Sequence, residues 1–127
     1  MLDDVNVLKQ RDRSGALAVV ADIYRQTALD VNLVDSEHDD RVINNIVVAG
    51  MGGSALAAEM AKVILHDSLT VPFEIVRGYE LPSYAHENTL VIASSFSGNT
   101  EETVACVEEA IKKSCQVVAI TGGGKLK

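Results

Sequence analysis

The first candidate site lies in residues 50–54, Gly-Met-Gly-Gly-Ser, which follow an apolar run and precede a helical pattern. Glycine lets a ligand approach the backbone closely, and a helix N-terminus presents unpaired N–H groups and the positive end of its dipole. Ser54 adds a hydroxyl donor. The segment could therefore bind an anion through the N–H groups at the helix start and the Ser54 hydroxyl, although glycines in this position could also serve only a tight turn.

The second candidate site lies in residues 94–102, Ser-Ser-Phe-Ser-Gly-Asn-Thr-Glu-Glu, again between an apolar run and a helical pattern. Its donors are three hydroxyl groups and two backbone amides, from Ser95, Ser97, Thr100, Gly98 and Asn99. Such donors can form a concave nest for phosphate oxygens. The alternative is that Ser97 or Asn99 only caps the helix, but three hydroxyls are more than one cap needs.

Neither segment contains a lysine. This excludes the P-loop of nucleoside triphosphatases, which ends in Gly-Lys-Ser/Thr. Charge-assisted hydrogen bonds contribute about 1.5–3 kcal/mol each, so several donors can hold a phosphate without a lysine in the loop. The residue types indicate a small phosphomonoester as the ligand.

A dinucleotide site is the rival interpretation. Gly50, Gly52 and Ala55 satisfy the loose pattern G-x-G-x-x-A after a strand, and Arg77 at the end of the next apolar run could suit a 2′-phosphate. This interpretation leaves the second hydroxyl-rich segment unexplained, so we rank it below the phosphomonoester.

Short apolar runs alternate with helical patterns and must position both segments. We expect strands at 46–49, 73–76, 90–93 and 116–120, with helices near 55–65 and 100–113. Uninterrupted apolar strands alternating with helices indicate a three-layer α/β/α parallel sheet, which places both segments at the carboxyl ends of the strands. The inward face of the first helix is expected to carry Leu56, Met60, Val63 and Ile64. An open α/β domain usually has at least five strands, so we expect the domain to be truncated after the fourth.

The first third of the chain has a helical pattern from about residue 5 to residue 34. Its apolar positions recur every three or four residues, at Leu17, Val20, Ala21, Tyr24, Ala28 and Val31. An acidic polar patch at 35–40 then reads as a solvated connector. We therefore expect an N-terminal helical arm and linker at 1–40 and an α/β domain at 41–127.

Composition limits the partners and the location. A formal charge of -7 argues against nucleic acid or an anionic membrane as the main partner, because both require a basic face. The acidic N-terminus lacks the pattern of a signal peptide, and no apolar run approaches the roughly 20 residues that span a bilayer, so a cytoplasmic location is expected.

Two cysteines are too few for a disulfide framework, and we expect both to be buried thiols. The three histidines are widely separated, and no metal site is expected.

Three segments resemble the motifs of the sugar isomerase (SIS) domain family, and within it those of the bifunctional phosphoglucose/phosphomannose isomerases. They are residues 50–54, residues 95–103 and residues 119–126, in the order that the family has them. The stretch 76–79, Val-Arg-Gly-Tyr, is also similar, and the resemblance extends from about Val42 to the end of the chain.

The resemblance implies a five-stranded parallel sheet, a homodimer and a 6-phosphosugar ligand. It also implies interconversion of glucose 6-phosphate or mannose 6-phosphate with fructose 6-phosphate through a cis-enediol, with no cofactor or metal. Carried over by motif, the phosphate ligands are Gly53, Ser54, Ser95, Ser97 and Thr100. The catalytic residues of the family are expected beyond Lys127, so the chain alone is expected to be inactive. The alternative is a non-catalytic phosphosugar sensor, since SIS modules also occur in regulators.

Overall fold

The computed structural model describes residues 4–28, 30, 34 and 40–127. The chain divides into two compact units, residues 1–37 and residues 38–127. No helix in these described ranges is long and apolar enough to cross a membrane.

The described residues of the N-terminal unit form three short helical elements, so the expectation of one continuous helix is wrong, and most of its last part, residues 29–34, lies outside the described residues. The three elements are α1 (Val5–Arg11), α2 (Ala16–Asp22) and the 3₁₀ helix η1 (Ile23–Ala28). Gly15 interrupts the helical run because its φ is +70°, in the left-handed region. The Asp12 carboxylate then accepts the N–H groups of Ala16 and Leu17 at 2.8 and 2.9 Å, which starts a new helix.

The apolar stripe expected on this arm is exposed where the structure describes it. Leu17, Val20 and Tyr24 are all more than half exposed, and none of the arm's described residues is buried. Val31 and the acidic stretch 35–39 lie outside the described residues. Helical periodicity thus identified an apolar face without showing what it packs against.

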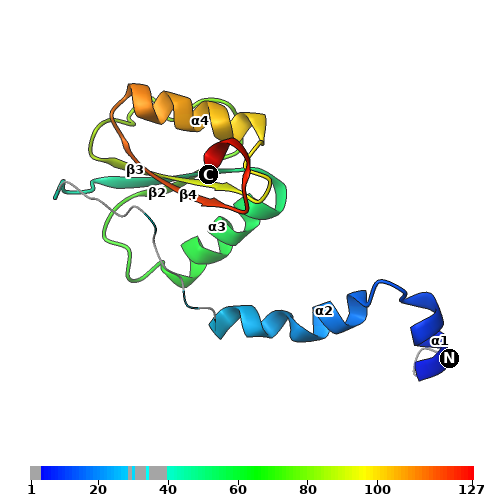
Figure 1. Cartoon of the computed structure of the whole chain (residues 1–127). Coiled ribbons are helices and arrows are strands. Elements are labelled where there is room, and N and C mark those ends of the chain that lie inside the picture. Colours follow the sequence, from blue (N-terminus) through cyan, green and yellow to red (C-terminus); the bar gives the residue numbers. More distant parts are fainter. Residues whose placement is uncertain (1–3, 29, 31–33, 35–39) are drawn as a thin grey trace. The chain divides into compact units, whose positions relative to one another are not determined.

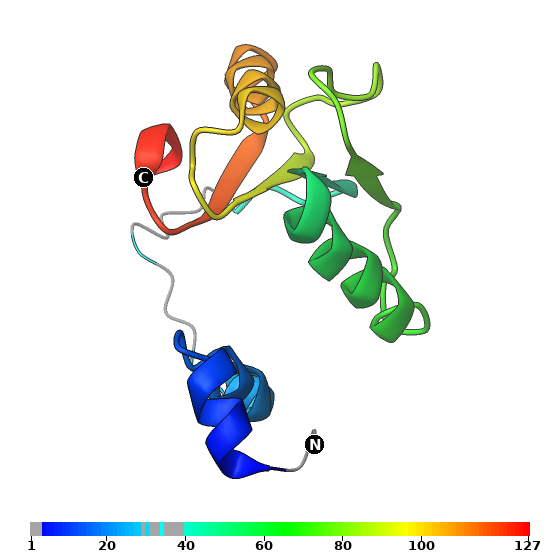
Figure 2. The ribbon, with the colours of Figure 1, turned by 90° about the vertical axis from the view of Figure 1, so that its right-hand side faces the viewer.

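The second unit is built on a four-stranded, fully parallel sheet in the order β2-β1-β3-β4. The strands are β1 (Asn45–Gly50), β2 (Phe73–Val76), β3 (Thr89–Ser95) and β4 (Gln116–Thr121). Helix α3 (Gly52–Ile64) covers one face and helix α4 (Glu101–Lys112) covers the other (Figures 1 and 2). The four expected strands and the three-layer α/β/α class are confirmed.

The core lies between the sheet and α4. Val47, Ala49 and Val91 point to this face, and Cys106 and Ala110 of α4 pack against them with no exposed surface. Both cysteines are free and buried, as expected, and burial raises the pKa of Cys106 to about 11.

The expectation for the inward face of α3 is wrong. Ala55 and Ala58 are its buried residues, whereas the four large apolar residues expected there are more than half exposed: Leu56, Met60, Val63 and Ile64. Helix α3 begins close to the sheet, since a Cβ on Gly50 would lie 3.5 Å from the amide nitrogen of Ala55. Only small side chains fit at so close an approach, so residue size decides which face is inside.

The loop after β2 is fastened to α4 by Glu109. Its Oε2 accepts the Leu81 N–H at 2.8 Å, and its Oε1 lies 2.9 Å from Nζ of Lys113. The Leu81 hydrogen bond and the Lys113 interaction hold the pKa of the Glu109 carboxyl below its usual value. Lys113 also donates to the Pro82 carbonyl at 3.4 Å, so both side chains retain the loop.

Replacing Glu109 by Gln should lower the free energy of unfolding at pH 7 by about 1 kcal/mol, the usual order for one partly exposed charged contact. Because the folded-state pKa is depressed, the ionised carboxylate stabilises the fold above the unfolded pKa and this stabilisation is lost as pH falls through the folded value. The difference between wild type and variant should therefore shrink in acid. Urea unfolding at pH 7 and at pH 3.5 measures it.

The control is Glu108→Gln, which removes the same charge from an exposed neighbouring position. A Glu109→Gln variant as stable as Glu108→Gln at pH 7, or a difference that does not depend on pH, would contradict this role.

Candidate functional site

The chain changes direction between β1 and β3, which are neighbours in the sheet. From β1 it passes to β2 on one side, and from β3 it passes to β4 on the other. Ligands of open α/β sheets bind at such a switch point, outside the carboxyl ends of the strands. Gly50 and Ser94 are register partners there, so the two candidate segments begin side by side.

The first segment leads directly into α3. Gly52 is the first helical residue, with φ +52°, and the N-cap residue Met51 makes no side-chain capping bond. Gly53 and Ser54 complete the start of the helix, and the Ser54 N–H donates to the Met51 carbonyl at 3.1 Å. A Cβ on Gly53 would meet nothing within 4 Å, so this end of the helix is open to a ligand.

Ser95 organises the second segment from inside. It is 2% exposed, and its Oγ accepts the Gly98 N–H at 3.2 Å. The same Oγ lies 2.8 Å from Oγ1 of Thr100. When Ser95 donates this bond, the proton of Thr100 is available to a ligand.

Thr100 and Ser97 both have hydroxyl groups that do not cap α4. Thr100 is the N-cap residue of the helix but makes no side-chain capping bond. Ser97 Oγ accepts the Asn99 N–H at 3.2 Å and keeps its own proton to donate. Ser97 therefore does not cap α4. The amides of Gly98 and Asn99, which the sequence suggested as ligands, donate within the loop.

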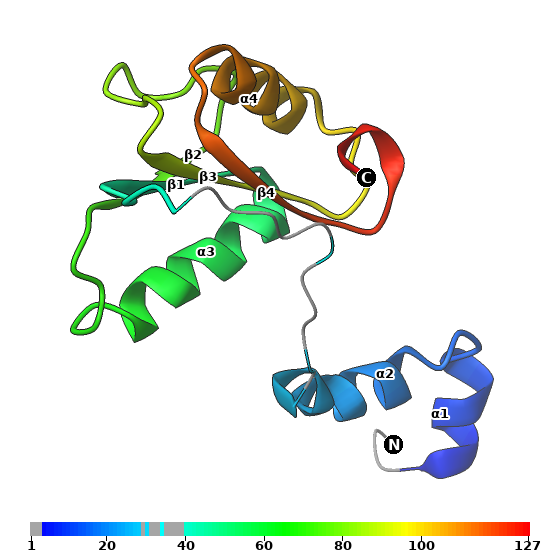
Figure 3. The ribbon, with the colours of Figure 1, turned by 60° about the vertical axis from the view of Figure 1, so that its left-hand side comes forward.

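A third loop, after β4, packs against the second, and sequence reasoning gave it no part in the site. The Gly122 N–H donates to the Phe96 carbonyl at 3.0 Å, and the Lys125 N–H donates to Oδ1 of Asn99 at 3.1 Å. Figure 3 shows this C-terminal turn beside the loop that precedes α4. The run Gly122-Gly123-Gly124 is the sequence signal for this contact. It indicates the contact only once β3 and β4 are known to be neighbours in the sheet.

Glycine is required at position 98 by this packing. Its φ is +64°, and a Cβ there would lie 1.7 Å from the Gly123 carbonyl oxygen and 2.7 Å from Oγ1 of Thr121. Thr121 in turn donates to the same Gly123 oxygen at 2.7 Å. The two loops therefore meet backbone to backbone.

Charged groups surround the other side of the switch point. Arg77, after β2, forms an ion pair with Glu59 of α3 at 3.2 Å. The Glu102 carboxylate, partial burial and Glu101 raise the pKa of Tyr79. Carboxylates in the first turn of a helix interact favourably with its dipole, and Glu101 and Glu102 lie in the first turn of α4. Their position is thus explained without a catalytic role.

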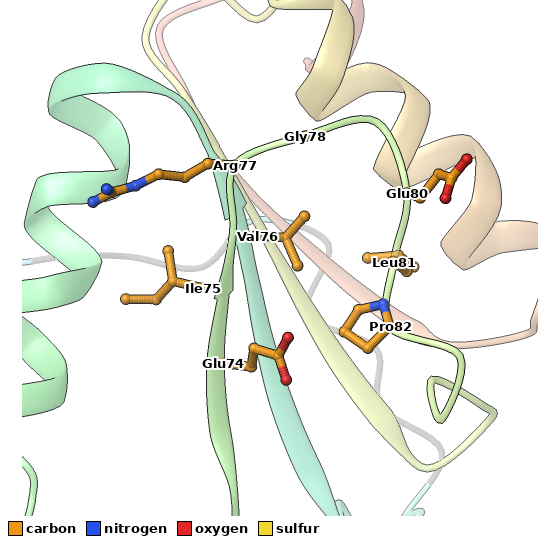
Figure 4. Close-up of a pocket in the computed structure, with 8 residues that line it drawn as sticks. All are labelled: Glu74, Ile75, Val76, Arg77, Gly78, Glu80, Leu81 and Pro82. Carbon is orange, nitrogen blue, oxygen red and sulfur yellow. The ribbon is translucent and has the colours of Figure 1, made fainter.

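A shallow hollow of about 370 Å³ lies elsewhere, along β2 and the loop that follows it (Figure 4). Its lining residues are Glu74, Ile75, Val76, Arg77, Gly78, Glu80, Leu81 and Pro82. It includes none of the predicted phosphate ligands and no helix N-terminus. The switch point, where hydroxyl and amide donors gather, is therefore the better candidate site.

The parallel sheet and its loops at the switch point define a flavodoxin-like α/β domain. The SIS domain family matches residues 41–125, and the chain belongs to this family. It is 46% identical over 85 residues to a bifunctional phosphoglucose/phosphomannose isomerase of Caldicellulosiruptor bescii, and 41% identical over 101 residues to one of Thermoplasma acidophilum. These matches cover 67% and 80% of this chain but only 25% and 32% of the two relatives.

The comparison with solved structures agrees with this family. A crystal structure of a candidate phosphosugar isomerase from Bacillus subtilis superposes with a TM-score of 0.62 and 26% identity. The match covers 68% of this chain and 28% of that one. The chain therefore spans between a quarter and a third of the length of these similar proteins.

Replacing Gly98 by Ala should lower the free energy of unfolding by more than about 2 kcal/mol, because the new methyl group would force two backbone segments apart at a positive φ. Replacing Gly53 by Ala is the matched control, because open space surrounds its Cβ position. That variant should stay within about 1 kcal/mol of wild type. Urea unfolding compares them, and equal stability of the two variants would contradict the packing described.

Proposed function

We propose that this SIS domain binds the phosphate group of a 6-phosphosugar at the switch point between β1 and β3. The observation that carries the proposal is that two helices begin there without a side-chain cap, beside hydroxyl groups that can donate. Open helix N-termini attract anions through their N–H groups and their dipoles. The sequence resemblance points to the same ligand.

The proposed ligands differ in how they act. Ser54, Ser97 and Thr100 donate hydroxyl protons to phosphate oxygens, and Gly53 donates its amide N–H. Ser95 is buried, so its part is to hold Thr100 in position through the 2.8 Å contact between their hydroxyl oxygens. The proposal therefore uses all five predicted phosphate residues.

A phosphosugar is a better candidate than a dinucleotide. Arg77, the residue that could have met a 2′-phosphate, is engaged by Glu59. The relatives with 41–46% identity are named as isomerases of phosphosugars.

We propose that the domain, as part of a chain as long as those of its relatives, serves an aldose-ketose isomerase. The reaction moves a proton between C1 and C2 through a cis-enediol, so glucose 6-phosphate or mannose 6-phosphate exchanges with fructose 6-phosphate without a cofactor. The two candidate segments, residues 50–54 and 94–102, are the phosphate loops of this proposal. They hold the 6-phosphate end of the sugar and leave C1 and C2 to other groups. None of the residues assigned here is the general base, so the 127-residue chain should bind the sugar phosphate without turning it over.

The proposal also includes the remaining expectations from the sequence. They are an arm and linker at 1–40, an SIS domain at 41–127, a homodimer and a cytoplasmic location. The formal charge of -7 supports the absence of nucleic acid and anionic membrane from the partners.

Isothermal titration calorimetry with fructose 6-phosphate and with fructose tests the binding step. The wild-type chain should bind fructose 6-phosphate and not fructose. Ser97→Ala should weaken binding at least about tenfold, because one hydrogen bond to a charged group is worth about 1.5–3 kcal/mol.

Ser83→Ala is the control, because Ser83 is an exposed serine far from the site. Its neighbour Pro82 is contacted by Lys113, which follows the C-terminus of α4, whereas the proposed ligands lie at the N-terminus of that helix. Equal affinity of the two serine variants would remove Ser97 from the site. Absence of binding by folded wild-type chain would remove the proposed function.

A further inference from the structure

We propose that Lys125 supplies the positive charge of the phosphate site, its ammonium group forming an ion pair with a phosphate oxygen. This inference rests on the proposed function and adds a ligand from the third loop. Lys125 follows the glycine run after β4, and neither of the first two loops contains a lysine or arginine.

Hydrogen bonds through the Asn99 side chain hold the Lys125 backbone against the loop that precedes α4. The Lys125 N–H donates to Oδ1 of Asn99, whose Nδ2 donates to the Ser97 carbonyl at 3.2 Å. Asn99 therefore ties the backbone of Lys125 to that of Ser97, a proposed ligand. The stem of a lysine is long enough to bring its ammonium to a phosphate bound at Ser97.

The neighbouring glycine confirms how closely the loops approach. A Cβ on Gly124 would lie 2.4 Å from the Ser97 carbonyl oxygen and 2.8 Å from Nδ2 of Asn99. Gly124 also has a φ of +73°, so no other residue fits this position without strain. The residue before Lys125 thus touches the residue that donates to the phosphate.

Charge balance gives Lys125 a role there. A phosphomonoester carries a charge of about -1.5 to -2 at pH 7. Arg77 is engaged by Glu59, and Glu101 and Glu102 bring negative charge to the start of α4. Within the described ranges, Lys125 is exposed and its ammonium group forms no ion pair.

Lys125 reaches the site from the β4 side. It follows β4, whereas Arg77 follows β2 at the other end of the strand order. Lys125 can therefore meet the phosphate from the side opposite Arg77.

The test is fructose 6-phosphate titration of wild type, Lys125→Met, Lys125→Arg and Lys127→Met. Lys127→Met removes the same charge two residues away. Lys125→Met should weaken binding about tenfold, as for the loss of one charge-assisted hydrogen bond. Lys125→Arg should keep most of the affinity, and Lys127→Met should match wild type.

Salt dependence gives a second readout that a merely structural role would not change. The affinity of wild type should fall more steeply with sodium chloride concentration than that of Lys125→Met, because the variant has one ion pair fewer to screen. If wild type binds and Ser97→Ala weakens binding while Lys125→Met binds like wild type, this inference is wrong and the proposed function stands. Equal losses in Lys125→Met and Lys127→Met would also overturn it, and absence of wild-type binding would overturn both proposals.

Discussion

The parallel pairing of β1 with β3 is the constraint on which the candidate site depends. It sets Gly50 opposite Ser94, so the loops after both strands leave the sheet at the same edge. The chain then passes to opposite sides from these strands, the arrangement at which open α/β sheets bind ligands. Donors separated by about 40 residues in the sequence become parts of one surface because of this pairing.

Within that surface, hydrogen bonds inside the protein determine which donors are free. The amides of Gly98 and Asn99 are used within the second loop, and Ser95 is buried beneath it. Ser97 accepts a hydrogen bond and keeps its own proton, and Thr100 keeps its proton when Ser95 donates the hydrogen bond between them. The buried groups thus shape the loop, and the exposed ones remain for a ligand.

Much of this arrangement could be predicted from the sequence. The apolar runs identified all four strands, and the glycine and hydroxyl patterns identified two loops that the sheet brings to one edge. Periodicity failed for α3, because the sheet accepts only Ala55 and Ala58 at close range. It also failed in the arm, where the left-handed Gly15 and the capping carboxylate of Asp12 divide the helix.

The contact of the third loop with the second was missed for a different reason. It depends on the position of β4 beside β3 and on backbone approach at Gly98 and Gly124, neither of which a local pattern contains. The resemblance had already marked the third glycine run as a family motif. The structure adds the contacts by which that run borders the phosphate loop.

The most direct test of the central claim is an NMR titration of the ¹⁵N-labelled chain with fructose 6-phosphate. We expect the largest amide shifts at the two helix starts, at Gly52, Gly53 and Ser54 and at Ser97, Thr100 and Glu101, with little change along β2. Shifts confined to the hollow beside β2, or a folded chain with no shifts at either helix start, would contradict the account.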